Sequence, residues 1–144
     1  MTAEEKVDEL IAQFDLAAGE LLKGNPGSTE GVWSHRQDVT LANPLGPVVR
    51  GWEQVAATGR HAASQVRDGE LVDVENVMKC VTPELAYIVR VERAKAKVGG
   101  HEAVTPFSLR VTMIMRPEDG GWKIVHRHAD PITAARPAES MIQQ

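Results

Sequence analysis

The feature that most constrains the fold is a series of strand-like segments that fills the second half of the chain. Each is rich in β-branched and apolar residues, and short turns containing Gly, Pro or Asp separate them. We predict strands at residues 71–81, 85–98, 104–116 and 121–130. Because turns this short connect neighbouring strands, the sequence predicts an antiparallel meander.

The first half of the chain has helical rather than strand periodicity. Thr2 and Glu5 form a T-x-x-E capping box, and the apolar residues that follow recur at helical spacing for about five turns. These apolar residues are Val7, Leu10, Ile11, Phe14, Ala18, Leu21 and Leu22. Ser28 or Thr29 can cap a short second helix, which would carry Val32 and Trp33 and form a hairpin with the first.

A third helix is predicted from Gly51 to the break at Asp68 and Gly69. Before it, residues 38–51 indicate a short strand and an ordered loop. Helices followed by strands predict an α+β fold with a curved sheet around the N-terminal helices. With 144 residues, the chain is the size of one domain, which we place at residues 1–132, followed by a C-terminal tail at 133–144.

Composition and charge exclude several classes of function. The formal net charge is −4 and no run of basic residues is present, so we expect neither nucleic acid nor a membrane as a partner. The N-terminus is acidic and no apolar run is long enough to span a bilayer, so we expect a cytoplasmic protein. The single Cys80 excludes an internal disulfide and a multi-cysteine zinc site.

The last predicted strand carries the strongest candidate chemistry. His126, His128 and Asp130 alternate along it and should lie on one face, continuing a row that starts with two core residues, Trp122 and Ile124. We predict these three as catalytic residues, with His128 and Asp130 transferring protons. The opposite face should be half-exposed and consists of Lys123, Val125, Arg127 and Ala129.

Two other interpretations of this row remain open. The histidines can hydrogen-bond loops or a partner subunit, while Asp130 forms a turn with Pro131. Alternatively, the two histidines can supply two metal ligands, with Asp130 or His35 as a third. The preferred interpretation uses neither a metal nor another cofactor.

Two segments resemble a known family. They are WSHRQDVTLANPLGPVVRGW (33–52) and LRVTMIMRPEDGGWKIVHRHAD (109–130). The chain is similar over residues 5–132 to the SnoaL-like, ketosteroid isomerase-like branch of the nuclear transport factor 2-like superfamily. The resemblance implies a cone-shaped, cystatin-like fold, a pocket between helices and sheet, and a homodimer formed through the convex side of the sheet. The second segment also resembles the association domain of calcium/calmodulin-dependent kinases, a non-catalytic assembly module.

The resemblance does not extend to steroid isomerase chemistry. The catalytic base of those enzymes lies in an E-D-P-x-G motif, and Asn43 stands at its position here. Their oxyanion-binding tyrosine and protonated acid correspond to Phe14 and Val111. Because an amide, a phenyl ring and a valine cannot perform this proton transfer, the steroid isomerase mechanism is not supported.

The same resemblance places further candidates around the pocket. Trp33, His35, Asn43 and Trp52 fall where pocket mouths occur in this fold and suit a flat apolar ligand. Tyr87, Arg90 and Arg110 are added as ligand-binding candidates on the sheet, although Arg90 and Glu92 can instead form a solvated pair. We therefore expect a pocket for a small, mostly apolar organic molecule, with cofactor-free acid/base catalysis of isomerase, cyclase, dehydratase or hydrolase type. The alternative is a non-catalytic binding or dimerisation module.

Overall fold

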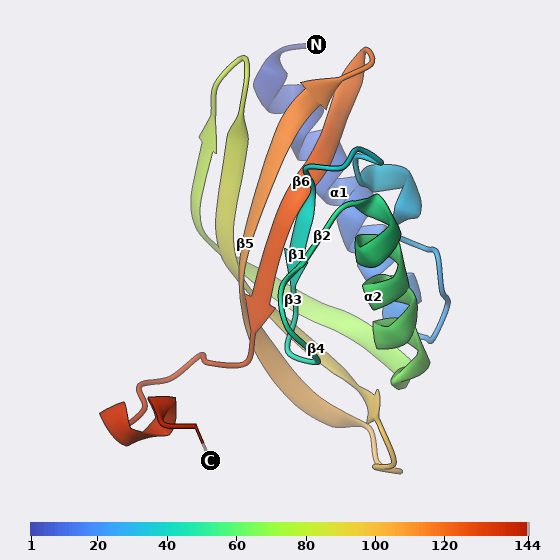
Figure 1. Ribbon diagram of the computed structural model, residues 1–144, viewed down its shortest axis with the longest axis vertical. Coiled ribbons are helices and arrows are strands. Elements are labelled where there is room, and N and C mark those ends of the chain that lie inside the picture. The colour runs from blue at the N-terminus through green and yellow to red at the C-terminus, as the bar shows by residue number, and fades with distance from the viewer. Residues whose placement is uncertain (144) are drawn as a thin grey trace.

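The computed structural model describes residues 1–143 as an α+β fold, in which two helices cover the concave face of one curved sheet (Figure 1). The elements are α1 (Ala3–Leu22), the 3-10 turn η1 (Glu30–Val32), β1 (Thr40–Ala42), β2 (Val49–Arg50), α2 (Trp52–Ser64), β3 (Val66–Val81), β4 (Ala86–Val98), β5 (Thr105–Glu118), β6 (Gly121–Asp130) and the 3-10 turn η2 (Ala138–Met141). The sheet has six strands in the order β2-β1-β6-β5-β4-β3. The predicted α+β class and the β3–β6 meander are confirmed.

Helix α1 forms as its sequence predicts. The Thr2 hydroxyl accepts a hydrogen bond from the backbone N–H of Glu5 at 3.1 Å, which caps the first turn. Val7, Leu10 and Phe14 share one buried face and pack against the sheet. The predicted second helix is only the single turn η1, and Trp33 follows it in extended conformation beside Ile124 of β6.

Helix α2 ends at Ser64, and β3 has already started at Val66, so the predicted helix stop at Asp68 and Gly69 is wrong. These two residues instead produce an irregularity inside β3, where the pairing with β4 shifts register. A Cβ on Gly69 would lie 2.6 Å from Cβ of Ala96 and 2.8 Å from the carbonyl oxygen of Leu22. Glycine is therefore required where β3 crosses the end of α1.

Strand β6 contains a second irregularity, which decides where its polar side chains point. Ile114 of β5 pairs with His126, but the next residue, Met115, pairs with Ile124. Val125 is thus an extra residue on β6, a β-bulge, and side-chain alternation changes face at this point. The prediction that the row from Trp122 to Asp130 lies on one face is therefore wrong.

After the bulge, the two faces of β6 are exchanged relative to the prediction. Val125 and Ala129 are buried among the core residues, and Arg127 between them points to the helices. His126 and His128 lie on the opposite side of the sheet. We call the sheet face toward the helices the inner face and the opposite one the outer face.

The end of the chain does not pack on the domain. Residues 131–143 leave the sheet after β6 and extend away from it (Figure 1), and Met141 and Ile142 are exposed. Gln144, the last residue of the predicted tail, lies outside the described residues, and the boundary at residue 132 stays a prediction. No helix among residues 1–143 combines the length and apolar character needed to cross a membrane.

Candidate functional site

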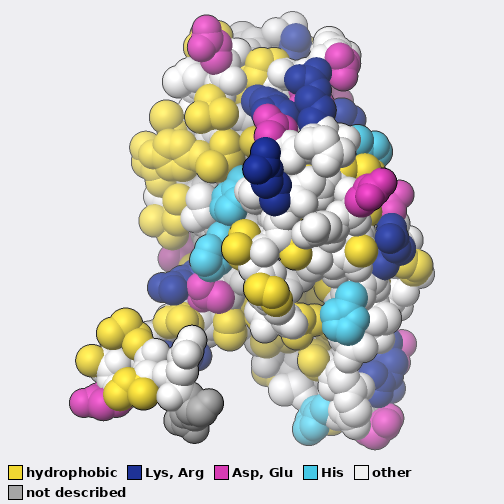
Figure 2. All heavy atoms as spheres, viewed as in Figure 1, with side chains coloured by type: hydrophobic (Ala, Val, Ile, Leu, Met, Phe, Trp, Pro, Cys, Tyr) yellow, Lys and Arg dark blue, Asp and Glu magenta, His cyan; other side chains and the backbone are white. Residues whose placement is uncertain are grey.

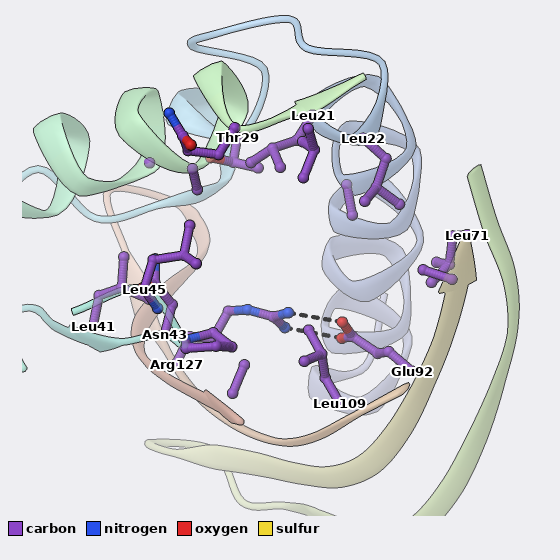
Figure 3. Close-up of a pocket in the computed structure, with 18 of the residues that line it drawn as sticks. Leu21, Leu22, Thr29, Leu41, Asn43, Leu45, Leu71, Glu92, Leu109 and Arg127 are labelled. Atoms are coloured by element: carbon purple, nitrogen blue, oxygen red, sulfur yellow. Dashed lines mark hydrogen bonds and ion pairs between the residues drawn. The ribbon is translucent and has the colours of Figure 1, made fainter. Parts of the chain in front are cut away.

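A cavity of about 610 Å³ lies between α1, α2 and the inner face of the sheet. Figure 3 shows leucine side chains from α1, from the loop after β1 and from the sheet directed toward it. Most of its lining is apolar and includes Phe14, Leu21, Trp33, Trp52, Phe107 and Leu109. A volume of this size and character is typical of sites for small organic molecules.

Three of the predicted ligand-binding residues line the cavity: Trp33, Asn43 and Trp52. The side-chain oxygen of Asn43 accepts a hydrogen bond from the backbone N–H of Leu45 at 3.0 Å, which fixes the amide in the loop after β1. His35 does not line the cavity but stacks on Trp52, with ring centroids 3.9 Å apart and planes 9° from parallel. Because a carbonyl only accepts, Nε2 of His35 donates to the Glu30 oxygen at 2.8 Å.

A buried ion pair between strands β4 and β6 forms part of the cavity wall. Nη1 and Nη2 of Arg127 donate to the two carboxylate oxygens of Glu92 at 2.9 and 2.7 Å, drawn as dashed lines in Figure 3. Arg90, which is only 1% exposed, donates to Glu92 from the other side at 2.9 and 3.0 Å. Arg90 also donates to the two carboxylate oxygens of Asp15 on α1 at 2.6 and 3.3 Å.

The solvated alternative for Arg90 and Glu92 is therefore wrong, because both are buried on the inner face. Phe14 lies between the two arginines, with its ring centroid 5.8 Å from Cζ of Arg90 and 4.9 Å from Cζ of Arg127. Burial acts to raise the pKa of Glu92, but Arg127 and Arg90 outweigh it and lower the pKa to about 2. The carboxylate is thus ionised at neutral pH and is a poor proton acceptor.

Arg127 is the cavity residue that sequence reasoning assigned to the wrong environment. Its alternation with His126 and His128 is visible in the sequence, but the extra residue at Val125 is not, so Arg127 was expected on a half-exposed face. One signal for the inner location of Arg127 was available in the sequence. Arg90 and Glu92 alternate on β4 and so share one face, and a buried carboxylate there needs basic partners.

The predicted catalytic residues lie on the outer face and do not line the cavity. Nε2 of His128 is 3.1 Å from Oδ2 of Asp130, so the predicted pair does form. Nδ1 of His126 is 2.7 Å from the Thr40 hydroxyl of the neighbouring strand β1. The proton-transfer role of these three residues stays a prediction.

Asp130 is the best-connected member of this outer group. Its Oδ1 accepts from Nε of Arg110 at 2.7 Å and from the backbone N–H of Ile132 at 3.0 Å. Burial acts to raise the pKa of Asp130, but these hydrogen bonds and that to His128 outweigh it and lower the pKa.

Arg110 and Tyr87, both predicted to bind ligand, are exposed on the outer face and away from the cavity. Among residues 1–143, no three His, Cys, Asp or Glu side chains are grouped so that they could hold a metal ion.

The positions compared with steroid isomerases fall inside the fold. Asn43 and Phe14 line the cavity, whereas Val111 is buried in the core of β5. A proton-transfer base, a phenol and a carboxylic acid are thus replaced by an amide, a phenyl ring and an aliphatic side chain.

Comparison with solved structures supports this fold over nearly the whole chain. A candidate dehydratase of the nuclear transport factor 2-like family from Streptomyces avermitilis is 18% identical with a TM-score of 0.73, and the match covers 92% of this chain and 98% of the other. A nuclear transport factor 2-like superfamily protein from Salmonella enterica serovar Typhimurium is 16% identical with a TM-score of 0.76, covering 95% and 96%.

A structure described as an association domain is also similar to the chain. A candidate calcium/calmodulin-dependent protein kinase II association domain from Xanthomonas campestris is 18% identical with a TM-score of 0.67, and the match covers 88% of both chains. No curated protein sequence gives a significant match. At these identities the similar structures show the fold alone.

The model of the SnoaL-like domain, in contrast, matches the sequence itself over residues 28–133. The chain therefore belongs to the SnoaL-like domain family, and it shares the fold of nuclear transport factor 2-like proteins.

Proposed function

We propose that this protein binds a small, mostly apolar organic molecule in the cavity between its two helices and the inner face of the sheet. The observation that carries the proposal is the cavity itself, with about 610 Å³ of space and a lining dominated by leucine and aromatic side chains. Trp33 and Trp52 supply flat surfaces within it, and Asn43 supplies a hydrogen-bonding amide.

The buried carboxylate of the cavity, Glu92, supports a binding function rather than acid/base catalysis. A general base works best when its pKa lies near the working pH, and the pKa of Glu92 is about 2. Its oxygens are also occupied by the two arginines. In this proposal Glu92 holds Arg127 in place and does not move protons.

The experiment that tests binding uses the neutral dye Nile red, whose fluorescence increases in apolar surroundings. On α2, Ala56 lines the cavity, whereas its neighbour Ala57 is exposed to solvent. Ala56→Trp fills part of the cavity, so we expect it to weaken dye binding by about tenfold or more, equivalent to about 1.4 kcal/mol. Ala57→Trp makes the same change on the same helix and should leave affinity within about twofold. Equal affinities in the two variants would contradict the proposal.

A second candidate function is self-assembly through the outer face. The specific observation is a group of apolar side chains on that face near the turn between β3 and β4, where Tyr87 pairs with Ile114 and Met78 pairs with Val89. Figure 2 shows hydrophobic side chains gathered over the β3–β4 hairpin, next to histidines. Exposed apolar groups of this kind are typical of protein interfaces, and the similar kinase association domain supports assembly.

The mass of the protein in solution tests this second candidate. Tyr87→Glu places a charge in the apolar group and should convert a homodimer to a monomer in sedimentation analysis. Leu16→Glu is the control, because Leu16 is 77% exposed on α1, away from the outer face. A wild-type protein that is monomeric at micromolar concentration would exclude the homodimer.

A further inference from the structure

Arg127 has N–H groups left over after its ion pair with Glu92. Nη1 donates to Oε2 of Glu92 at 2.9 Å and to the sulfur of Met113 at 3.6 Å, while Nη2 donates to Oε1 of Glu92 at 2.7 Å. A guanidinium carries five N–H groups in a fixed plane, so the N–H of Nε and one N–H of Nη2 remain without a partner. These two groups form a second planar fork, which matches the spacing of carboxylate oxygens.

The free edge of Arg127 is in contact with open space. Its side chain lines the cavity and runs along the wall toward Glu92 (Figure 3). Among residues 1–143, the one side-chain nitrogen or oxygen that is both shielded from solvent and unpartnered is Oγ of Ser28. Nε of Arg127 therefore keeps accessible surface, which a bound molecule can reach.

The charges around this edge favour an anion. Glu92 is shared between Arg90 and Arg127, and Asp15 on α1 pairs with Arg90, so these four groups are balanced in charge. Asp15, however, is 32% exposed and lines a separate groove, so the carboxylate of this network at the cavity wall, Glu92, lies beside two guanidinium groups. The other basic side chains of the cavity lining, Arg60 and His101, are exposed, and Arg60 is 3.7 Å from Glu30.

We propose that the ligand of the cavity is an amphipathic carboxylic acid, whose carboxylate binds the free Nε–Nη2 edge of Arg127 while its apolar body contacts the leucine and aromatic lining. This inference rests on the proposed binding function and specifies the chemical class of its ligand. A low-dielectric wall strengthens such a charge-assisted, two-pronged contact relative to the same contact in water.

The experiment compares two probes of nearly the same shape, 2-naphthoate and 2-naphthamide, by titration calorimetry at neutral pH. The acid should bind about tenfold or more tightly than the amide, because hydrogen bonds to charged groups are the stronger ones. Arg127→Lys keeps a cation for Glu92 but removes the fork, so it should reduce the preference for the acid to about threefold or less. Ala56→Trp should weaken binding of both probes.

The possible failures are distinguishable. If Nile red and the amide bind but the acid has no advantage in the wild-type protein, the carboxylate inference is overturned and the binding function stands. A preference for the acid that survives Arg127→Lys also overturns the inference. If no probe and no dye binds, the binding function itself fails. Should Arg127→Lys not fold, a crystal structure of the wild-type protein with 2-naphthoate decides, because a carboxylate placed away from Nε of Arg127 overturns the assignment.

Discussion

Two carboxylates on opposite faces of the sheet each lie 2.7 Å from an arginine nitrogen, yet their surroundings differ. On the inner face, the side chains of Arg127 and Glu92 are 13% and 5% exposed. On the outer face, those of Arg110 and Asp130 are 56% and 17% exposed. Burial, rather than distance, should therefore decide how much the stability of the fold depends on each ion pair.

Neutralising each carboxylate should reveal this difference most strongly. Glu92→Gln leaves two buried arginines partly unpaired, so we expect it to lower the free energy of unfolding by about 3 to 5 kcal/mol. Asp130→Asn, the matched change on the outer face, should cost about 1 kcal/mol or less, because water replaces the lost partner. Urea denaturation of both variants measures the two losses. Similar losses for the two variants would break the comparison.

The pH dependence of stability should separate the same two carboxylates. The pKa of Glu92 is lowered from an ordinary 4.5 to about 2, so its contribution is complete above pH 4.5 and is lost as the pH falls toward 2. By linkage this contribution is about 3 kcal/mol. The stability difference between wild type and Glu92→Gln should therefore shrink over that range.

For Asp130, whose pKa is also lowered, the corresponding difference between wild type and Asp130→Asn should change in the same direction but by much less. Denaturation at several pH values between 2 and 6 gives both curves. A stability gap for Glu92→Gln that stays constant through this range would show that its ionisation does not contribute.

The smallest effect is expected at His128, which is 53% exposed on the outer face. His128→Gln removes the contact with Asp130 and should change the free energy of unfolding by about 0.5 kcal/mol or less. Nile red affinity should stay within about twofold, because His128 does not line the cavity. A larger loss of dye affinity would mean that the two faces are coupled.

Local patterns in the sequence were sufficient for most of the fold. The Thr2–Glu5 capping box and the apolar spacing after it predicted α1, and alternating residues with short turns predicted the meander. Strand β2 was expected as loop, because its two residues follow a segment rich in Pro and Gly. Asp68 and Gly69 have the composition of a helix stop, and the sequence does not show the close approach of Leu22 and Ala96 that requires glycine at position 69 within a strand.

The candidate site was predictable only in part. The family resemblance gives the position of the pocket, and Trp33, Asn43 and Trp52, which were expected there, line the cavity. Their role in ligand binding stays a prediction. The side of the sheet to which β6 directs its polar residues could not be predicted, because a bulge depends on the pairing with β5 and leaves no compositional signal at Val125.

The bulge at Val125 also has an evolutionary meaning. An extra residue in a strand normally exchanges its two faces from that point on, but the bulge absorbs Val125, so Ile124 and Arg127 stay on the same face. Loss of the Val125 codon would therefore leave His126 opposite Ile114 and keep Arg127 directed to the cavity. This point of the strand should tolerate the gain or loss of one residue during evolution, because the chemistry of the cavity stays the same.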